Sequence, residues 1–167
     1  VLIKGGVHLE NLGTLCTMTF DKTGTLTVGQ PEVTGVTAIG AESGDALLRI
    51  AAAAERQSQH PLAQAVVRAA TARQLTVPEA GPLESITARG VRADVEGQSV
   101  EIGSARLWTD RQIEVPVIVD VAVKQQQDAG RSVMIVRHGS QWLGVLGLAD
   151  QPRPEARDVL ARLREIG

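Results

Sequence analysis

Aromatic residues are almost absent from this 167-residue chain, which has no tyrosine, one phenylalanine and two tryptophans. Any core must therefore be built from aliphatic side chains, mainly Val, Leu, Ile and Ala. A single cysteine excludes an internal disulfide and is typical of a reducing compartment. A net charge of −2 gives no electrostatic reason to expect nucleic acid or an anionic membrane surface as a partner.

Long apolar runs are missing too. No stretch approaches the roughly 18–20 apolar residues that span a bilayer, and no signal-peptide pattern opens the chain. The hydrophobic content of 43% is enough for one good core or two small ones. Because the chain starts at Val1 rather than methionine and stops at Gly167, just after a helical pattern, we expect it to be a piece of a longer protein.

The most informative stretch is residues 21–27, with the sequence DKTGTLT. It follows an apolar, β-prone run, residues 15–20, which predicts a short buried strand. Asp21 would then stand at the carboxyl end of a strand, where open α/β sheets bind ligands, and a carboxylate there can attack a phosphoryl group. Donors that suit phosphate oxygens follow it: Lys22, Thr23 and Thr25.

Helical and β-type patterns then alternate along the chain. Ser43 is a good N-cap for a helix that runs to about Arg56, and Pro61 is a favoured first residue for a second helix towards Arg73. Further helices are predicted over residues 117–128 and after Pro154. Short strands are predicted at residues 33–39, 83–88, 91–95, 100–102, 133–136 and 143–146, with a tight turn at 96–98.

The junction between the first two of these helices, residues 55–63, carries a second candidate site. Pro61 fixes the position of His60, whose ring can stack on a base or donate a hydrogen bond, and Glu55 can accept one from an exocyclic amine. The residues alone leave open a second interpretation, in which His60 is a capping or buried structural histidine.

DKTGTLT resembles the phosphorylation motif of P-type cation-transporting ATPases, within the haloacid-dehalogenase-like fold. The resemblance implies Asp21 as the nucleophile, with Lys22 and Thr23 beside it. Simple phosphatases of this fold carry a second aspartate two positions after the nucleophile, as general acid and base, and here that position is Thr23. Without that group the acyl phosphate should persist, as a pump requires.

Residues 58–63, SQHPLA, look like the adenine-contacting motif of the heavy-metal subgroup of these ATPases. The resemblance implies nucleotide contacts from Glu55, Ser58, His60, Pro61, Gly90, Gly103, Thr25, Asp150 and Arg153. Residues 89–91 resemble the end of a glycine-rich nucleotide loop in which Ala88 replaces the first glycine, and Ser104 replaces an asparagine common after Gly103. Gly90 and Gly103 can also be ordinary turn glycines.

Residues 150–154 resemble the family's Asp-x-x-Arg-Pro junction, where Asp150 and Arg153 help to place the γ-phosphate. Asp150 is also a plausible N-cap for a helix that starts with proline.

The resemblance implies an α/β chain in which a partial haloacid-dehalogenase-like phosphorylation domain, residues 1–30 and 147–167, holds an inserted α+β nucleotide-binding domain, residues 31–146, with an antiparallel sheet flanked by helices. ATP and Mg²⁺ are the implied cofactors, and Asp21 and the Thr23 carbonyl supply part of the Mg²⁺ site. The family's remaining catalytic motifs lie downstream of Gly167, so we expect nucleotide binding but impaired turnover.

The implied whole protein is a heavy-metal exporter whose membrane, actuator and other phosphorylation parts are the partners of this cytoplasmic piece, in a bacterial plasma membrane. We expect a monomeric fragment with no nucleic-acid partner. Residues 4–6 and 9–13 look more like those of zinc, cadmium or cobalt exporters than those of copper exporters. Two alternatives stay open: a soluble phosphatase of the same superfamily, and a nucleotide-binding module without catalysis.

Overall fold

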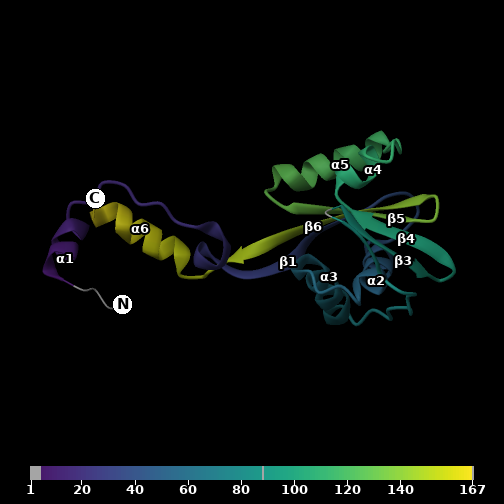
Figure 1. The fold of residues 1–167 in the computed structure, drawn as a ribbon, viewed down its shortest axis with the longest axis horizontal. Helices are drawn as coiled ribbons and strands as arrows, with labels where there is room; N and C mark the ends of the chain where they lie inside the picture. Colours follow the sequence, from purple (N-terminus) through teal and green to yellow (C-terminus); the bar gives the residue numbers. More distant parts are fainter. Residues whose placement is uncertain (1–4, 88, 167) are drawn as a thin grey trace. The chain divides into compact units, whose positions relative to one another are not determined.

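The computed structural model describes residues 5–87 and 89–166. Two residues used in the sequence analysis lie outside the described residues: Lys4, in the stretch compared with metal exporters, and Ala88, in the stretch compared with a glycine-rich loop. The chain divides into two compact units, one of Gln30–Asp150 and one of Val1–Gly29 with Gln151–Gly167 (Figure 1). The sequence placed these divisions after residues 30 and 146.

The larger unit is built on a six-stranded sheet with the strand order β1-β6-β5-β4-β3-β2. The neighbouring pairs from β6 to β2 are all antiparallel. The strands are β1 (Thr27–Ala38), β2 (Glu84–Ile86), β3 (Gly90–Val95), β4 (Gln98–Gly103), β5 (Ser132–His138) and β6 (Gln141–Pro152). β1 and β6 are longer than predicted, and each continues past the boundary of the larger unit.

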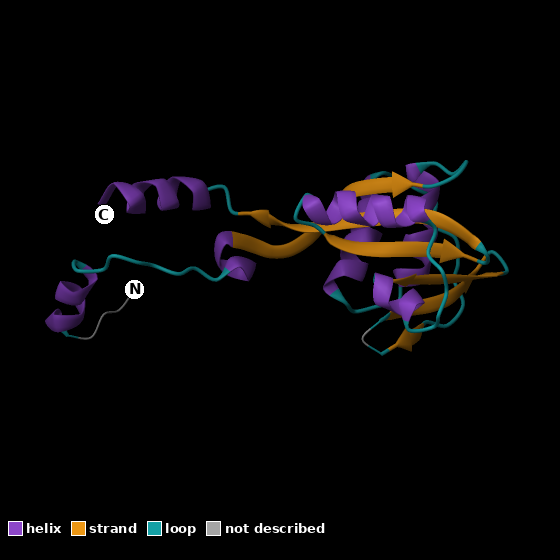
Figure 2. Cartoon of the chain, turned by 90° about the horizontal axis from the view of Figure 1, so that it is seen from above, coloured by secondary structure: helices purple, strands orange, loops and turns teal. Residues whose placement is uncertain are grey.

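Helices cover both faces of this sheet (Figures 1 and 2). On one face lie α2 (Gly44–Glu55) and α3 (Pro61–Ala72), and on the other lie α4 (Ala105–Thr109) and α5 (Val117–Asp128). The predicted start of α2 is present, because Ser43 Oγ accepts a hydrogen bond from the Ala46 N–H at 3.1 Å. Together, the antiparallel sheet and its flanking helices confirm the predicted mixed α/β class.

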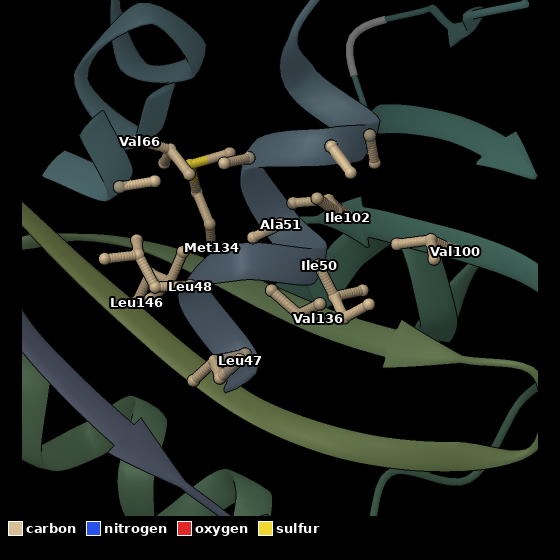
Figure 3. Close-up of a cluster of buried hydrophobic side chains, with 14 of the residues drawn as sticks. Leu47, Leu48, Ile50, Ala51, Val66, Val100, Ile102, Met134, Val136 and Leu146 are labelled. Carbon is tan, nitrogen blue, oxygen red and sulfur yellow. The ribbon is translucent and has the colours of Figure 1, made fainter. Parts of the chain in front are cut away.

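Each face of the sheet has its own hydrophobic core. Figure 3 shows the larger one, in which side chains of α2 and α3 meet those of β4, β5 and β6. Leu47, Leu48 and Val66 from the helices are fully buried there. Burial of each such side chain stabilises the fold by about 1.5–3 kcal/mol. The smaller core contains Leu107 and Trp108 of α4 against the opposite face.

The β3–β4 hairpin sets the register on which the candidate site depends. Its turn residues Glu96 and Gly97 have φ angles of 51° and 79°. Positive φ at both central residues is the geometry that tight antiparallel hairpins favour. The resulting pairing places Gly90 directly opposite Gly103, at the end of the two strands.

The smaller unit contains α1 (Gly6–Leu12), a tight turn (Lys22–Leu26) and α6 (Ala156–Ile166). The predicted buried strand over residues 15–20 is wrong, because this stretch is irregular and Leu15 and Met18 are 47% and 50% exposed. A strand needs a neighbour to satisfy its backbone, and the described strands all belong to the one sheet of the larger unit.

Candidate functional site

A pocket of about 390 Å³ opens in the larger unit where α2 ends and α3 begins. Its walls come from this helix junction, from the turn before β3, and from β3, β4 and β5. The lining residues are Glu55, Ser58, His60, Leu62, Ser85, Ile86, Arg89, Gly90, Val91, Ile102, Gly103, Ser104, Val133 and Met134. This Glu55 pocket has the size of a small-molecule site. Five residues that the sequence selected line it together: Glu55, Ser58, His60, Gly90 and Gly103.

Glu55, the last residue of α2, is only 3% exposed. Burial raises the pKa of its carboxyl to about 7, because desolvation penalises the charged form, and a hydrogen bond with Ser58 lowers the pKa by a smaller amount. Its Oε2 has no hydrogen-bond partner within the described part of the chain. A buried oxygen without a donor is costly unless a ligand supplies one, so this atom suits a ligand that carries an N–H group.

His60 is the N-cap of α3, and its Nδ1 accepts a hydrogen bond from the Leu62 N–H at 3.2 Å. Its own backbone N–H donates to Ser58 Oγ at 3.3 Å. With Nδ1 acting as an acceptor, the neutral ring carries its proton on Nε2, which is then a donor. Capping is therefore present in the structure, and the same ring also lines the pocket. Pro61 does not line the pocket; it starts α3 and holds the cap in place.

Gly90 and Gly103 are needed by the backbone itself. A Cβ on Gly90 would come within 2.0 Å of the Ile102 carbonyl oxygen, and one on Gly103 within 2.4 Å of the Arg89 carbonyl oxygen. Neither distance is compatible with a side chain, so both positions require glycine for close approach of the two strands. Both glycines line the pocket.

Sequence reasoning did not select Arg89 as a ligand contact, and it missed Val133 and Met134. Arg89 could have been noticed, because a cation beside a predicted ligand glycine is a local signal. Val133 and Met134 reach the pocket only because β5 pairs with β4, with Gly103 opposite Ile135. No local pattern reports such a register.

The DKTGTLT loop, residues 21–27, lies in the smaller unit. Asp21 is exposed and precedes the turn, Gly24 has a φ of 78°, and Thr27 is buried. Thr27 Oγ1 accepts from the Gly24 N–H at 3.2 Å and donates to the Lys22 carbonyl at 3.0 Å. These two bonds close the loop on itself. Thr23 has a φ of −79° and a ψ of 121°, which interrupts the helical turn directly after Lys22.

Arg153, which is distant from this loop in the sequence, donates hydrogen bonds to the loop backbone. Its Nε donates to the Thr25 carbonyl and its Nη2 to the Gly24 carbonyl, each at 3.1 Å. Its backbone N–H donates to the Leu26 carbonyl at 2.9 Å. A planar guanidinium suits two acceptors that lie side by side, so Arg153 holds the loop backbone in a fixed conformation.

Asp150 does not cap a helix, and that prediction is wrong. It lies within β6, and α6 begins only at Ala156. The strand continues because Asp150 Oδ1 accepts a hydrogen bond from the Gln30 N–H at 3.0 Å, which favours pairing with β1 over a helical start.

The predicted Mg²⁺ ligands do not form a complete site. Mg²⁺ requires six oxygen ligands in near-octahedral geometry. In residues 5–87 and 89–166, no group of three or more His, Cys, Asp or Glu residues could hold a metal ion. Asp21 and the Thr23 carbonyl supply two oxygens at most. The described residues alone therefore do not fit this ion.

None of the described helices combines the length and the apolar character that crossing a bilayer requires.

A family model described as haloacid dehalogenase-like hydrolase matches residues 17–167. The "Probable copper-exporting P-type ATPase V" of Mycobacterium tuberculosis is 38% identical over 167 residues, which are 100% of this chain and 22% of that protein. Other curated relatives are named as exporters or transporters of zinc, manganese and cadmium. The chain thus spans less than a quarter of the length of the first of these relatives.

Solved structures show the same similarity. A zinc-transporting PIB-type ATPase in its E2.Pi state matches with a TM-score of 0.84 and 36% identity, over 99% of this chain and 26% of that one. The N-domain of a copper-transporting P-type ATPase matches with a TM-score of 0.57 and 27% identity, over 71% of this chain and 98% of that one.

Proposed function

The chain belongs to the haloacid dehalogenase-like hydrolase family, and from this premise we propose that it is the ATP-binding and phosphorylation region of a heavy-metal cation-exporting P-type ATPase. The resemblance to heavy-metal P-type ATPases is confirmed by relatives named for copper, zinc and cadmium. Because the chain is a fraction of their length, the activity of the intact protein is part of the proposal.

One observation carries the proposal: five of the nine residues selected for nucleotide binding line a single pocket, which contains a buried carboxyl oxygen without a donor among the described residues. Adenine suits this pocket. Its amino group donates to Glu55 Oε2, and a ring nitrogen accepts from His60 Nε2. Gly90 and Gly103 line the same pocket, and their lack of a side chain lets β3 and β4 approach closely there.

We propose that the two units take the two roles that the sequence assigned. We propose Gln30–Asp150 as the nucleotide-binding domain and the remaining residues as segments of the phosphorylation domain. The likeness of 71% of the chain to a solved N-domain supports the first assignment. The roles expected for Thr25, Asp150 and Arg153 at the γ-phosphate stay predictions, and the hydrogen bonds of Arg153 support a role in holding the DKTGTLT loop.

In the proposed reaction an Asp21 carboxylate oxygen attacks the γ-phosphorus of ATP. A bond forms from that oxygen to phosphorus, the bond from phosphorus to the bridging oxygen breaks, and ADP leaves. Lys22 offsets the charge of the phosphate. Thr23 cannot act as an acid or base towards water, so the acyl phosphate survives until the pump changes conformation.

The transported ion is the least supported part of the proposal. Relatives named for copper, zinc, manganese and cadmium share 34–38% identity with this chain. Preference for zinc, cadmium or cobalt therefore stays a prediction, as does a bacterial plasma membrane. We propose that this region works on the cytoplasmic side, beside the membrane and actuator parts of the same pump.

An NMR titration of the 167-residue chain with ATP tests the nucleotide site. Amide signals of Glu55, Ser58, His60, Gly90 and Gly103 should shift at millimolar ATP without Mg²⁺. GTP should bind about 10-fold more weakly, because its ring oxygen faces the Glu55 carboxyl where adenine has an amino group. If ATP shifts none of these five signals, the proposed site is wrong.

A further inference from the structure

Arg89 has an unusual place in the Glu55 pocket. Among the described residues that line the pocket it is the only Lys or Arg. Glu55, at the end of α2, is buried, whereas the Arg89 side chain is 36% exposed. The pocket lining thus offers both a buried hydrogen-bond acceptor and a partly solvated cation. A ligand that matches it carries an amino-bearing ring and an anionic tail.

The Arg89 backbone is fixed on both sides. Its N–H donates to the Ile86 carbonyl at 2.9 Å, and its carbonyl accepts from the Ser104 N–H at 3.2 Å. Because Gly103 has no Cβ, the Arg89 carbonyl can lie close against the end of β4. The Arg89 backbone is therefore already ordered. If the guanidinium contacts a ligand, only the rotamers of the side chain have to be fixed, which keeps the entropic cost of binding small.

The guanidinium is held by Asp110, the residue that ends α4. Arg89 Nε donates to Asp110 Oδ2, and the two side chains are 36% and 49% exposed. No other hydrogen bond joins the Arg89 side chain to the described residues. Exposed ion pairs of this kind are weak, so an incoming group with a higher negative charge can replace the carboxylate.

We propose that Arg89 contacts the phosphate chain of the nucleotide in the Glu55 pocket, and that Asp110 lowers nucleotide affinity by competing for the same guanidinium. The inference rests on the proposed nucleotide site. Under this proposal, Arg89 makes the larger unit bind nucleotides, which carry phosphate, more tightly than nucleosides, which do not.

The test compares adenosine with ATP, without Mg²⁺, by calorimetry on the 167-residue chain. The variant Arg89→Gln removes the charge and keeps most of the length. It should weaken ATP binding by about 3- to 10-fold and change adenosine binding by less than about 2-fold. Asp110→Asn should strengthen ATP binding by about 2- to 3-fold. Arg89→Lys should restore most of the affinity for ATP.

Arg92→Gln is the matched control, because Arg92 lies on β3, bonds to Ser99 Oγ and does not line the pocket. It should leave ATP affinity unchanged at about 150 mM salt, where distant charges are screened. Equal losses for adenosine and ATP in Arg89→Gln, or no loss for either, would overturn the inference while leaving the nucleotide site intact. If the wild-type chain binds neither ligand, the proposed function itself fails.

Discussion

The Glu55→Gln variant should remove a pH dependence of stability that the wild-type chain shows between about pH 4.5 and 8. Burial raises the Glu55 pKa from 4.5 to about 7. Because its pKa is raised in the folded state, the Glu55 carboxyl binds its proton more tightly in the folded chain than in the unfolded chain. The contribution of the protonated carboxyl to the free energy of unfolding is therefore fully present below pH 4.5. It is lost as the pH rises through 7.

The magnitude follows from the size of this shift. Each unit of pKa corresponds to 1.36 kcal/mol, so ionisation of Glu55 should cost about 3 kcal/mol of unfolding free energy by pH 8. Glutamine has nearly the same shape and does not ionise. Its own burial cost is independent of pH and cancels when the two curves are compared across the pH range.

Urea unfolding at several pH values, followed by tryptophan fluorescence, measures this difference. Trp108 is fully buried in the larger unit, and its ring meets Trp142 at a centroid distance of 4.8 Å. Glu84→Gln is the control, since Glu84 is exposed on β2 and loses the same charge. If the difference between wild type and Glu55→Gln stays constant from pH 4.5 to 8, Glu55 is solvated and the reasoning fails.

Variants at three further positions probe the site and the loop. His60→Asn and His60→Ala should both weaken ATP binding by about 5- to 30-fold. Only His60→Ala should also lose about 1 kcal/mol of stability in thermal melts, because asparagine can still cap α3. Equal affinity in a folded variant would exclude an adenine contact. Gly90→Ala should destabilise the chain by about 1–3 kcal/mol, since its Cβ would lie 2.0 Å from a backbone carbonyl oxygen of β4. Gly81→Ala is the control and should change stability little, because the nearest atom to its Cβ would be 3.6 Å away. Arg153→Ala should speed hydrogen exchange in the DKTGTLT loop by about 5- to 10-fold through loss of its hydrogen bonds to the loop backbone, and exposed Arg157→Ala should not.

Local signals were sufficient for the elements that frame the pocket. Ser43 and Pro61 mark the starts of α2 and α3 because capping and first-turn chemistry depend on nearby residues only. The turn at Glu96 and Gly97 follows in the same way from its backbone requirements. With the hairpin and the two helices placed, five predicted site residues meet in one pocket.

Non-local features could not be predicted in this way. The stretch 15–20 has strand composition, but whether it becomes a strand depends on a partner for its backbone. Asp150 has the sequence context of a helix cap, yet its pairing with Gln30 keeps it in β6. Val133 and Met134 reach the pocket through the β4–β5 register, which no local pattern contains.

Phosphorylation of Asp21 in the full-length protein tests the central claim most directly. After incubation with ³²P-labelled ATP and Mg²⁺, the wild-type protein should carry acid-stable label, and Asp21→Asn should carry none while it still binds ATP, because an amide keeps the shape but is not a nucleophile. Equal labelling of wild type and Asp21→Asn would contradict the account. So would a wild-type protein that binds ATP but never becomes labelled, which would identify a nucleotide-binding module without catalysis.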